Sequence, residues 1–426
     1  MHVLFFKLAT LSLLAAVILT SAAPLSASAA SSSKKGETKS TKEASGKLEV
    51  SGWIPYWRTD AGTRDASAHL SQLTEVNPFG YTVKADGTLN DAANIQSRAW
   101  QDLFKAAKAK KVRVIPTVMW SDTDAIHKVL SDPKKRAAHI QSIVKAVNDN
   151  GFDGIDIDYE GKKAETRTYY SAFLKELAAE FGKKKSNKWL MCTIEARMPL
   201  EARFSGTPPA NIEYANDFKE INTYCDRVRV MTYDQQTADL QLNAAARAAN
   251  EAYAPVADVK WVEKVINYMA KDIDKKKMSI GIATYGYIYQ LMPYTDGSGF
   301  NYIKTEAFNP AYATDIAAKY GITPTRNRAG ELSFTYVPKE QVSALPNQGF
   351  LAALAPRGTT SGNLAAAGAL ALAKKDKKQA PVQLLWWSDA KAIGDKVALA
   401  KKLKVAGVSV FKFDGGSDPK MWDYLK

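Results

Sequence analysis

Short apolar segments rich in β-branched residues alternate with longer amphipathic stretches from about residue 50 to the end of the chain. The longer stretches, such as SRAWQDLFKAAKAK, have apolar residues at helical spacing. Strands that alternate with helices predict a parallel sheet, and eight such strands close a (β/α)8, or TIM, barrel. We therefore predict an α/β fold with a TIM barrel. The eight expected strands are residues 50–57, 76–83, 112–120, 152–160, 189–196, 227–234, 278–286 and 407–414.

One interval between the expected strands is much longer than the others. About 120 residues separate the seventh strand from the eighth, far more than one helix needs. Because this interval contains the hairpin-like segment ELSFTYV, we predict a small α+β insertion over residues 288–390. Within it, residues from about 351 to 380 are biased toward Ala, Gly and Lys, and we expect a mobile flap there.

The N-terminal residues predict export. Lys7 precedes the apolar run LATLSLLAAVILT and a group of small residues, so residues 1–30 have the pattern of a secretory signal peptide. The run is shorter than the roughly 20 residues of a membrane span, which makes an uncleaved anchor the weaker alternative. Residues 31–47 are polar and predict a flexible linker, and the barrel domain is expected over residues 48–426. We expect a secreted or cell-envelope protein.

The segment GFDGIDIDYEG, residues 151–161, places four acidic side chains in a predicted strand. Alternate residues of a strand point to opposite faces, so Asp156, Asp158 and Glu160 all face the barrel axis, and the apolar residues between them face the helices. Asp153 has the opposite parity and is expected to be structural. Clustered carboxylates raise one another's pKa, which suits a general acid. Glu160 is last in the strand and is expected at the mouth of the barrel, where barrel enzymes carry out chemistry.

Two other interpretations of this segment are weaker. Acidic residues at every second position from Asp156 also begin a calcium-binding loop, but that loop needs an acidic residue at its twelfth position, where this chain has Arg167. A solvated edge strand would not have apolar residues on one parity and helical segments on both sides. We therefore interpret the carboxylates as catalytic.

The motif DGIDIDYE, residues 153–160, resembles the D-x-x-D-x-D-x-E signature of glycoside hydrolase family 18, the chitinase-like barrels. The segments VMTYD (230–234), GIATYGY (281–287) and SGWIPYW (51–57) resemble the sixth, seventh and first strands of that family. The segments VNPFGYTVKADGTL and APVADVKWVEKVINYM are most similar to the bacterial branch that includes spore-cortex N-acetylglucosaminidases. The LysM wall-binding repeats that are frequent in that branch are not found in this sequence.

The resemblance implies a glycosidase that cleaves β-1,4 bonds next to N-acetylglucosamine with retention of configuration. Glu160 is expected to protonate the glycosidic oxygen while the 2-acetamido group of the substrate attacks the anomeric carbon. By the same resemblance, Asp158 orients the acetamide and Asp156 modulates the pKa of Asp158. Tyr233 is expected to donate a hydrogen bond to the acetamide oxygen.

Further residues are assigned to the substrate pocket. The resemblance places Met231 and Asp234 in its lining, and it shows Phe411 where the family usually has a Trp beneath the sugar, which leaves a smaller stacking surface. Glu195 and Arg197, at the end of the fifth strand, could meet a charged substrate group or pair within the protein. Aromatic residues at strand ends are candidate sugar platforms, although core packing explains each one equally well. These residues are Trp57, Phe79, Tyr81, Trp120 and Tyr285.

The sequence indicates neither a metal site nor a cofactor. The four histidines are not clustered, and no Walker A loop or Gly-rich dinucleotide turn is present. Two cysteines, Cys192 and Cys225, are expected to be buried thiols on neighbouring strands, and a single disulfide between them is the alternative.

The formal net charge of +14 is concentrated in lysine clusters that directly precede strands, such as KAKKVRV, KKKMSI and KKLKVAGVSV. These positions are helix C-terminal ends on the barrel face opposite the mouth. Helix-dipole complementation and solubility explain the clusters, and binding of anionic wall polymers is the alternative. No recognition module for nucleic acid accompanies the charge, so no nucleic-acid partner is expected.

Peptidoglycan is the substrate that we expect first, and chitin or its oligosaccharides second. A carbohydrate-binding lectin on the same barrel and a structural protein of the envelope are the alternatives from other classes. Relatives that are lectins commonly lack the acid, whereas this chain has Asp156, Asp158, Glu160 and Tyr233, so an enzyme is favoured.

Overall fold

The computed structural model describes residues 47–182, 187–339 and 346–426. The predicted signal peptide, residues 1–30, and residues 31–46 of the predicted linker lie outside the described residues. In the described part of the chain, no helix combines the length and the apolar character that crossing a bilayer requires.

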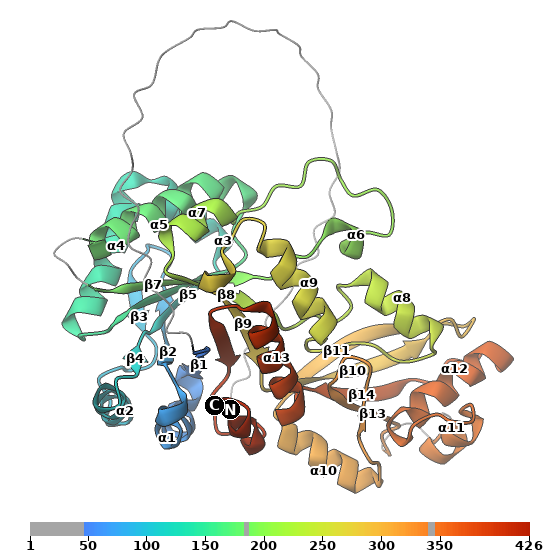
Figure 1. Ribbon diagram of the computed structural model, residues 1–426. Coiled ribbons are helices and arrows are strands. Elements are labelled where there is room, and N and C mark those ends of the chain that lie inside the picture. The colour runs from blue at the N-terminus through green and yellow to red at the C-terminus, as the bar shows by residue number, and fades with distance from the viewer. Residues whose placement is uncertain (1–46, 183–186, 340–345) are drawn as a thin grey trace, which may run out of the picture. The chain divides into compact units, whose positions relative to one another are not determined.

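Eight parallel strands form a barrel surrounded by helices (Figure 1). In order around the sheet, they are β1 (Glu49–Pro55), β2 (Glu75–Val83), β5 (Thr117–Trp120), β6 (Gly154–Tyr159), β7 (Trp189–Glu195), β8 (Arg227–Met231), β9 (Met278–Ala283) and β15 (Gly407–Phe411). The sheet is closed because β1 pairs with both β2 and β15. The predicted TIM barrel is therefore confirmed.

The third barrel strand is interrupted. Its first part, β4 (Arg113–Val114), and its second part, β5, both pair with β2. Pro116 lies at the interruption and has no backbone N–H to donate to a neighbouring strand. The short strand β3 (Leu89–Asp91) runs antiparallel to β2 at the rim.

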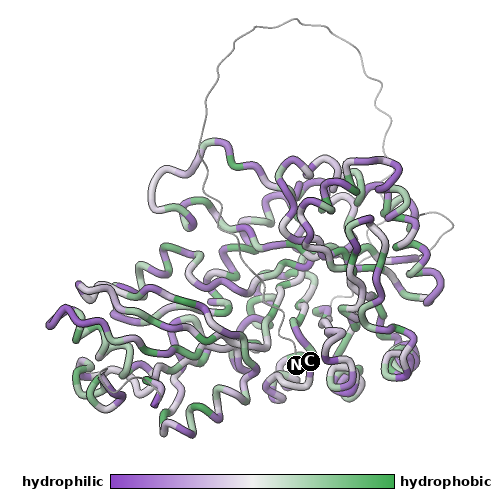
Figure 2. Tube along the Cα trace, turned by 180° about the vertical axis from the view of Figure 1, so that it is seen from behind, coloured by the Kyte–Doolittle hydropathy of each residue, from purple (hydrophilic) through white to green (hydrophobic). Residues whose placement is uncertain are grey.

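Helices follow the barrel strands, and Figure 2 shows hydrophobic residues concentrated on the central strands and hydrophilic residues on the outer helices and loops. Aspartate side chains accept hydrogen bonds from backbone N–H groups at the first turn of α3, α4, α7, α8, α9 and α13, which fixes where these helices begin. The helices are α1 (Thr59–Ala68), α2 (Arg98–Ala109), α3 (Thr123–Ser131), α4 (Pro133–Asp149), α5 (Arg167–Gly182), α6 (Leu200–Arg203), α7 (Phe218–Tyr224), α8 (Leu240–Ala248), α9 (Val259–Met269) and α13 (Ala390–Leu403).

A second, antiparallel sheet is inserted between β9 and α13, beside the barrel (Figure 1). Its strands, in sheet order, are β11 (Phe300–Phe308), β10 (Gly286–Pro293), β14 (Val382–Trp387), β13 (Leu332–Tyr336) and β12 (Thr325–Arg326). Its helices are α10 (Pro310–Tyr320), α11 (Gln348–Leu354) and α12 (Leu364–Asp376). The inserted sheet begins only two residues after β9, so the seventh barrel strand leads directly into it.

The segment that we expect to be a mobile flap, at about 351–380, contains α12, and for this helix the expectation is wrong. Eight residues of α12 are buried, and the helix contacts α11, β10 and β13. The Ala- and Gly-rich composition serves close helix packing instead of mobility, because a Cβ at Gly368 would lie 1.9 Å from the backbone oxygen of Leu351.

The cysteines form a disulfide, so the preferred prediction of two free thiols is wrong. Cys192 lies on β7, whereas Cys225 ends α7, two residues before β8 begins. The two Cα atoms are 6.0 Å apart, within the range that a disulfide spans. The chain reverses its direction through α7, and this brings Cys225 next to Cys192. Strand periodicity in the sequence does not reveal such a reversal.

Replacing both cysteines by serine is expected to lower the free energy of unfolding by ~3 kcal/mol, because the bond closes a loop with a sequence separation of 33. Urea denaturation with and without dithiothreitol measures the change. The reductant should destabilise the wild-type chain to a similar extent and leave the double variant unaffected. Equal midpoints for the oxidised and reduced wild type would contradict a stabilising role.

Candidate active site

Strand β6 carries three carboxyl groups toward the barrel interior. Asp156 is fully buried, Asp158 is 4% exposed and Glu160 is partly exposed at the mouth. The residues between them face the helices: Ile157 is fully buried, and the Tyr159 ring packs at 5.4 Å on Phe173 of α5. The predicted alternation along this strand is therefore observed.

Asp156 is held by side chains from four other barrel strands, β1, β5, β7 and β8. Its Oδ2 accepts hydrogen bonds from Thr117 Oγ1 at 2.8 Å and Trp53 Nε1 at 3.1 Å, and its Oδ1 accepts one from Thr193 Oγ1 at 2.9 Å. Arg229 Nη1 lies 2.8 Å from Oδ2 without the alignment of a hydrogen bond, so that contact is an ion pair. Burial raises the pKa of Asp156 to about 6, and the three hydrogen bonds oppose that rise.

Asp158 and Glu160 are strongly coupled. Burial raises the pKa of Asp158 well above its ordinary value, and the charges of Glu160, Asp156 and Glu195 raise it further. Burial also raises the pKa of Glu160, followed by the charge of Glu195, while Lys162 opposes the rise. The Oδ1 atom of Asp158 is buried and has no hydrogen-bond partner among the described residues. The cluster therefore favours retention of a proton.

One buried cation lies against this cluster. The Lys162 side chain is 1% exposed, bonds the backbone oxygen of Tyr159 and places Nζ 4.0 Å from Glu195 Oε2. Glu195 also accepts hydrogen bonds from the backbone N–H of Gly161 and from Asn216 Nδ2, at 3.2 and 2.7 Å. Of the two interpretations of Glu195 that the sequence leaves open, these contacts support pairing within the protein.

Residues at the end of β8 and in the following loop form another wall of the site. Tyr233 stacks on Phe411 with the ring centroids 5.9 Å apart, and burial raises the pKa of its hydroxyl. Asp234 accepts hydrogen bonds from the hydroxyls of Tyr285 and Tyr287, at 2.8 and 2.7 Å. The backbone of Asp234 has φ 58°, a left-handed conformation that Asp tolerates better than most residues.

Two cavities open at the barrel mouth and meet at Asp234, which lines both. The larger, of about 800 Å³, is also lined by Glu160, Lys162, Met231 and Tyr233. The smaller, of about 360 Å³, is lined by aromatic residues and by one lysine; these include Tyr285, Tyr287, Phe308, Phe411 and Lys412. We call these two cavities together the cleft; Glu160 lines the larger one, and their volumes suit sugar units. Among the described residues, no group of three His, Cys, Asp or Glu side chains is arranged to hold a metal ion.

Comparison with protein families matches residues 52–416 to the glycosyl hydrolases family 18. The chain belongs to glycosyl hydrolase family 18. It is therefore a glycosidase, and the family predicted from the acidic motif is confirmed. The chain is similar to the cortical fragment-lytic enzyme of Bacillus subtilis, with 22% identity over 380 residues, which cover 89% of this chain and 73% of the relative.

Solved structures share the family 18 fold. The spore cortex-lytic enzyme SleL of Bacillus cereus aligns with a TM-score of 0.62 and 19% identity, over 89% of this chain and 73% of that chain. A chitinase of Chromobacterium violaceum aligns with a TM-score of 0.62 and 17% identity, over 89% of this chain and 98% of that chain. At these identities the structures establish the fold, and the cortex-lytic relatives agree with the branch that the sequence resembles.

Phe411 and the candidate platform Tyr285 line the smaller cavity of this family 18 barrel. Phe411 is partly exposed, and its ring lies about 6 Å from those of Trp53, Phe79 and Tyr285. Trp57 is 50% exposed and contacts Phe79 edge-on. An exposed aromatic surface thus continues outward from Phe411 along the rim.

Two other candidates pack in the core. Trp120 is 2% exposed and packs against His139 and Tyr159 on the helical side of β5, because it has the opposite parity to the inward-facing Thr117. Tyr81 is 6% exposed and belongs to the same apolar core. Strand parity alone identifies the orientation of Trp120.

The sequence reasoning missed the partners of Asp156 and the role of Lys162. Trp53, Thr117, Thr193 and Arg229 occupy inward positions of their strands, so the alternation that identifies the carboxylates also reveals these residues. The sequence also left open whether Arg197 meets a substrate group or pairs within the protein. In the structure, its guanidinium lies 3.7 and 3.9 Å from the ring centroids of Tyr214 and Phe218.

Proposed function

We propose that this family 18 glycosidase is exported and cleaves β-1,4 bonds next to N-acetylglucosamine in peptidoglycan, with retention of configuration. The observation that carries the proposal is the set of coupled carboxyl groups at the edge of the cleft, with Glu160 outermost. Burial and neighbouring negative charge favour the protonated form of Glu160, as a general acid near neutral pH requires.

Glu160 protonates the glycosidic oxygen in this mechanism, and the 2-acetamido oxygen of the substrate forms the bond to the anomeric carbon as the leaving group departs. Asp158 orients the acetamide. Its buried, unpartnered Oδ1 supports this role, because an acetamide N–H would supply the missing hydrogen bond. Tyr233 donates a hydrogen bond to the acetamide oxygen, and Asp156 modulates the pKa of Asp158.

Phe411 forms the floor beneath the reacting sugar in this proposal. Asp234 and Tyr285 line the smaller cavity with it, and Met231 lines the larger cavity. Phe79 and Trp57 extend the stacking surface toward the rim. The Phe411 ring is partly exposed at the cleft and is supported from below by Trp53, so it can stack on a sugar without rearrangement.

Peptidoglycan is favoured over chitin by the relatives of this chain. The Bacillus subtilis relative is a cortical fragment-lytic enzyme, and two solved relatives are spore cortex-lytic enzymes. Chitin oligosaccharides are the second candidate because chitinases share the fold.

The predicted signal peptide, residues 1–30, and the polar linker that follows it support export. The Cys192–Cys225 disulfide is consistent with this location, because such bonds persist in oxidising compartments. The proposed location is outside the cell or in its envelope.

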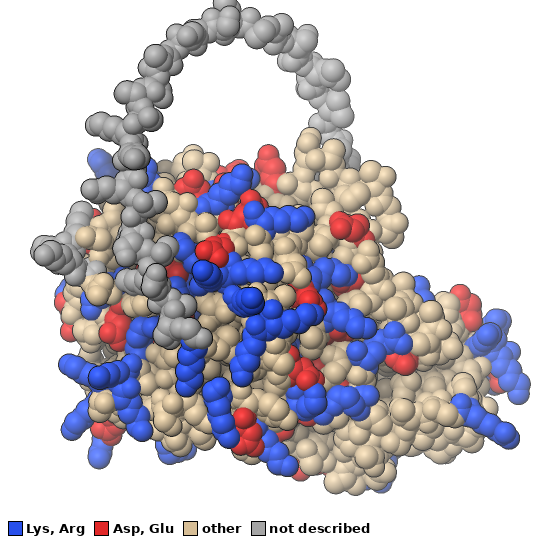
Figure 3. All heavy atoms as spheres, viewed as in Figure 1, with Lys and Arg blue, Asp and Glu red and all other residues tan. Residues whose placement is uncertain are grey.

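The barrel face opposite the mouth carries the lysine clusters, and we propose that this basic face holds the enzyme on anionic wall polymers. Exposed lysines gather at the C-terminal ends of α2 and α13, and Figure 3 shows basic side chains spread over the regions of α2, α9 and α13. A hollow of about 610 Å³ beside α2 is lined by Lys105, Lys108 and Lys111. Retention on purified walls should fall about tenfold or more when sodium chloride is raised to a molar concentration, and salt-independent retention would refute this contact.

Mass spectrometry of fragments released from purified peptidoglycan tests the proposed function. Fragments that end in reducing N-acetylglucosamine should appear with the wild-type chain and be absent with Glu160→Gln. Release from chitin oligosaccharides alone would assign the chitinase alternative. Binding without release from either polymer would instead assign a lectin.

A further inference from the structure

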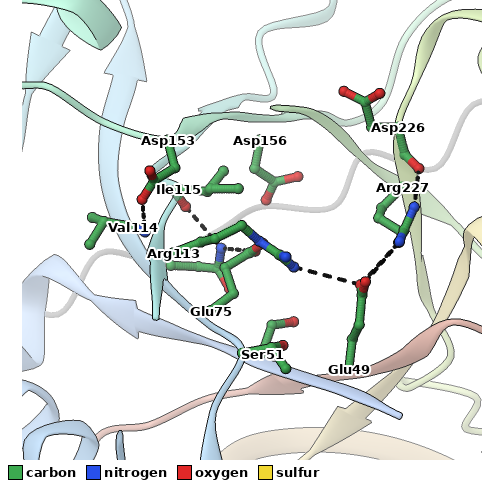
Figure 4. A network of polar contacts seen from close by, with 12 residues as sticks. Glu49, Ser51, Glu75, Arg113, Val114, Ile115, Asp153, Asp156, Asp226 and Arg227 are labelled. Carbon is green, nitrogen blue, oxygen red and sulfur yellow. Dashed lines mark hydrogen bonds and ion pairs between the residues drawn. The ribbon is translucent and has the colours of Figure 1, made fainter. Parts of the chain in front are cut away.

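Below Asp156, the barrel interior contains charged side chains where most small barrels have apolar ones (Figure 4). We call this group the interior charge column. It consists of Glu49, Glu75, Arg113, Arg227 and Arg229, contributed by β1, β2, β4 and β8.

Opposite charges alternate along the column. Arg227 makes two hydrogen bonds to Glu49, at 2.7 and 2.9 Å, and Arg113 Nη2 lies 3.7 Å from Glu49 Oε2. Arg113 Nε donates to Glu75 Oε2 at 3.1 Å, and Glu75 Oε1 accepts from Arg229 Nη2. The other terminal nitrogen of Arg229 lies 2.8 Å from Asp156 Oδ2, so the column ends at the carboxylates of the site.

The column itself carries one excess positive charge. Three arginines face two glutamates; Asp156 offsets the excess beside Arg229, and Asp153 acts on Arg113 at the other end. Arg229 is 2% exposed, and burial lowers its pKa to about 9, so its guanidinium is still charged at neutral pH. A buried cation of this kind needs a nearby anion.

The contacts of Asp156 favour its ionised form. Trp53, Thr117 and Arg229 all direct donors or positive charge at Oδ2, and Thr193 donates to Oδ1. A proton on Oδ2 would face these donors and leave the Arg229 guanidinium with Glu75 as its remaining counterion.

We propose that Arg229, held in place by Glu75, is a positioning residue that keeps Asp156 ionised, so that the proton of the carboxyl cluster resides on Asp158 or Glu160. This inference deepens the proposed function and rests on it for its kinetic test. Asp156 then serves as a fixed anion and does not exchange protons during turnover, and the acid at the mouth keeps the proton that it must donate.

Other titratable groups also face Asp156, and the substitutions in the test replace none of them. Asp158 and Glu160 share its strand, Tyr233 approaches from the end of β8, and Tyr170 approaches from α5. Lys162 offsets the charge of the upper two carboxylates. Variants of Arg229 and Glu75 leave all of these groups in place.

The test is the pH dependence of kcat/KM for Arg229→Met and Glu75→Gln, on the substrate that the wild-type chain cleaves. Arg229→Met removes the cation, so Asp156 accepts a proton more readily. The acidic limb of the profile, the range over which kcat/KM falls as the pH is lowered, should therefore move to higher pH by about one unit. That shift corresponds to a roughly tenfold lower kcat/KM below the limb. Glu75→Gln leaves Arg229 and Arg113 with one less counter-charge, so the same limb should move to lower pH.

Shifts of opposite sign distinguish this role from a structural one, since a loss of packing would lower kcat/KM in both variants without moving the limb. Arg229→Lys keeps the charge and should restore most of the wild-type profile. If both variants fold and the acidic limb of kcat/KM stays at the wild-type pH, or moves in the same direction in both, the inference is overturned. If Arg229→Met does not fold, the direction of the Glu75→Gln shift decides.

A second readout does not depend on turnover. In protein labelled with ¹³C at the aspartate carboxyl carbon, the Asp156 signal is identified by its loss in Asp156→Asn. Its titration midpoint should rise in Arg229→Met and fall in Glu75→Gln. A wild-type chain that cleaves no N-acetylglucosamine polymer would refute the proposed function alone, whereas an unchanged Asp156 midpoint in both variants would refute the role of Arg229.

Discussion

Glu160→Gln is expected to lower kcat by ~10²- to 10⁴-fold, the usual contribution of a positioned general acid. Glutamine has nearly the shape of glutamic acid, but its amide cannot supply a proton to the departing oxygen. Burial and the charge of Glu195 raise the pKa of Glu160 in the wild type, and the substitution removes the proton that this shift favours. Initial rates on the cleaved polymer and calorimetric binding of a soluble oligosaccharide measure the two effects separately.

Binding should change far less than turnover, because the aromatic floor at Phe411 and the contacts around Asp158 remain. Glu165→Gln is the matched control: it makes the same chemical change on a side chain that is 62% exposed, five residues further along the chain. The control should retain wild-type rates. A Glu160→Gln variant with more than a tenth of the wild-type kcat would exclude Glu160 as the acid.

Lys396→Met is expected to lower the free energy of unfolding by ~3–5 kcal/mol, the usual cost of leaving one partner of a buried ion pair alone. Lys396 of α13 and Glu331 of the insertion are both fully buried, with Nζ 3.1 Å from Oε1. Glu331 also accepts hydrogen bonds from Trp386 Nε1 and from the backbone N–H groups of Val256 and Ala257. This carboxylate therefore joins the inserted sheet, the segment before α9 and a barrel helix, and the loss of the lysine removes its counter-charge.

Lys391→Met on the same helix is the control for this stability measurement. Lys391 is 54% exposed and pairs with Asp395 one turn away, so its loss should cost no more than about 0.5 kcal/mol. Adding Glu331→Gln to Lys396→Met should recover part of the loss, because a neutral amide oxygen still accepts hydrogen bonds. Denaturant midpoints for the four proteins measure these differences, and equal midpoints for Lys396→Met and the wild type would contradict the argument.

The alternation of short apolar strands with amphipathic helices was sufficient to predict the fold, and period-two alternation was sufficient to predict which carboxylates of the acidic strand face the barrel interior. It places Asp156, Asp158 and Glu160 inside the barrel and the apolar residues between them outside, and the structure agrees. The same rule, applied to every strand, also predicts that Arg229 faces inward and Trp120 outward. Those two positions were missed because the rule was applied to one strand only.

Other features depend on contacts between distant segments, which local patterns do not contain. The Cys192–Cys225 bond requires the path of α7 between β7 and β8. Composition suggested mobility for α12, but the small residues that suggested it allow close packing against α11. The pairing of Lys396 with Glu331 joins residues 65 positions apart in the chain. Of these contacts, the Lys396–Glu331 pair is the one that forms only when the insertion has folded onto the barrel.

The two ends of the inserted unit lie next to each other, and this arrangement affects how the unit can change in evolution. Gly286 and Trp387 are direct partners across β10 and β14, so the chain departs from the barrel and rejoins it at neighbouring positions. An inserted unit with adjacent ends can be lengthened, exchanged or lost through recombination while the barrel path is preserved. Lys396 would have to change with it, since its counter-charge belongs to the inserted unit. New substrate ranges could therefore evolve by exchange of this unit, without selection acting again on the acidic strand.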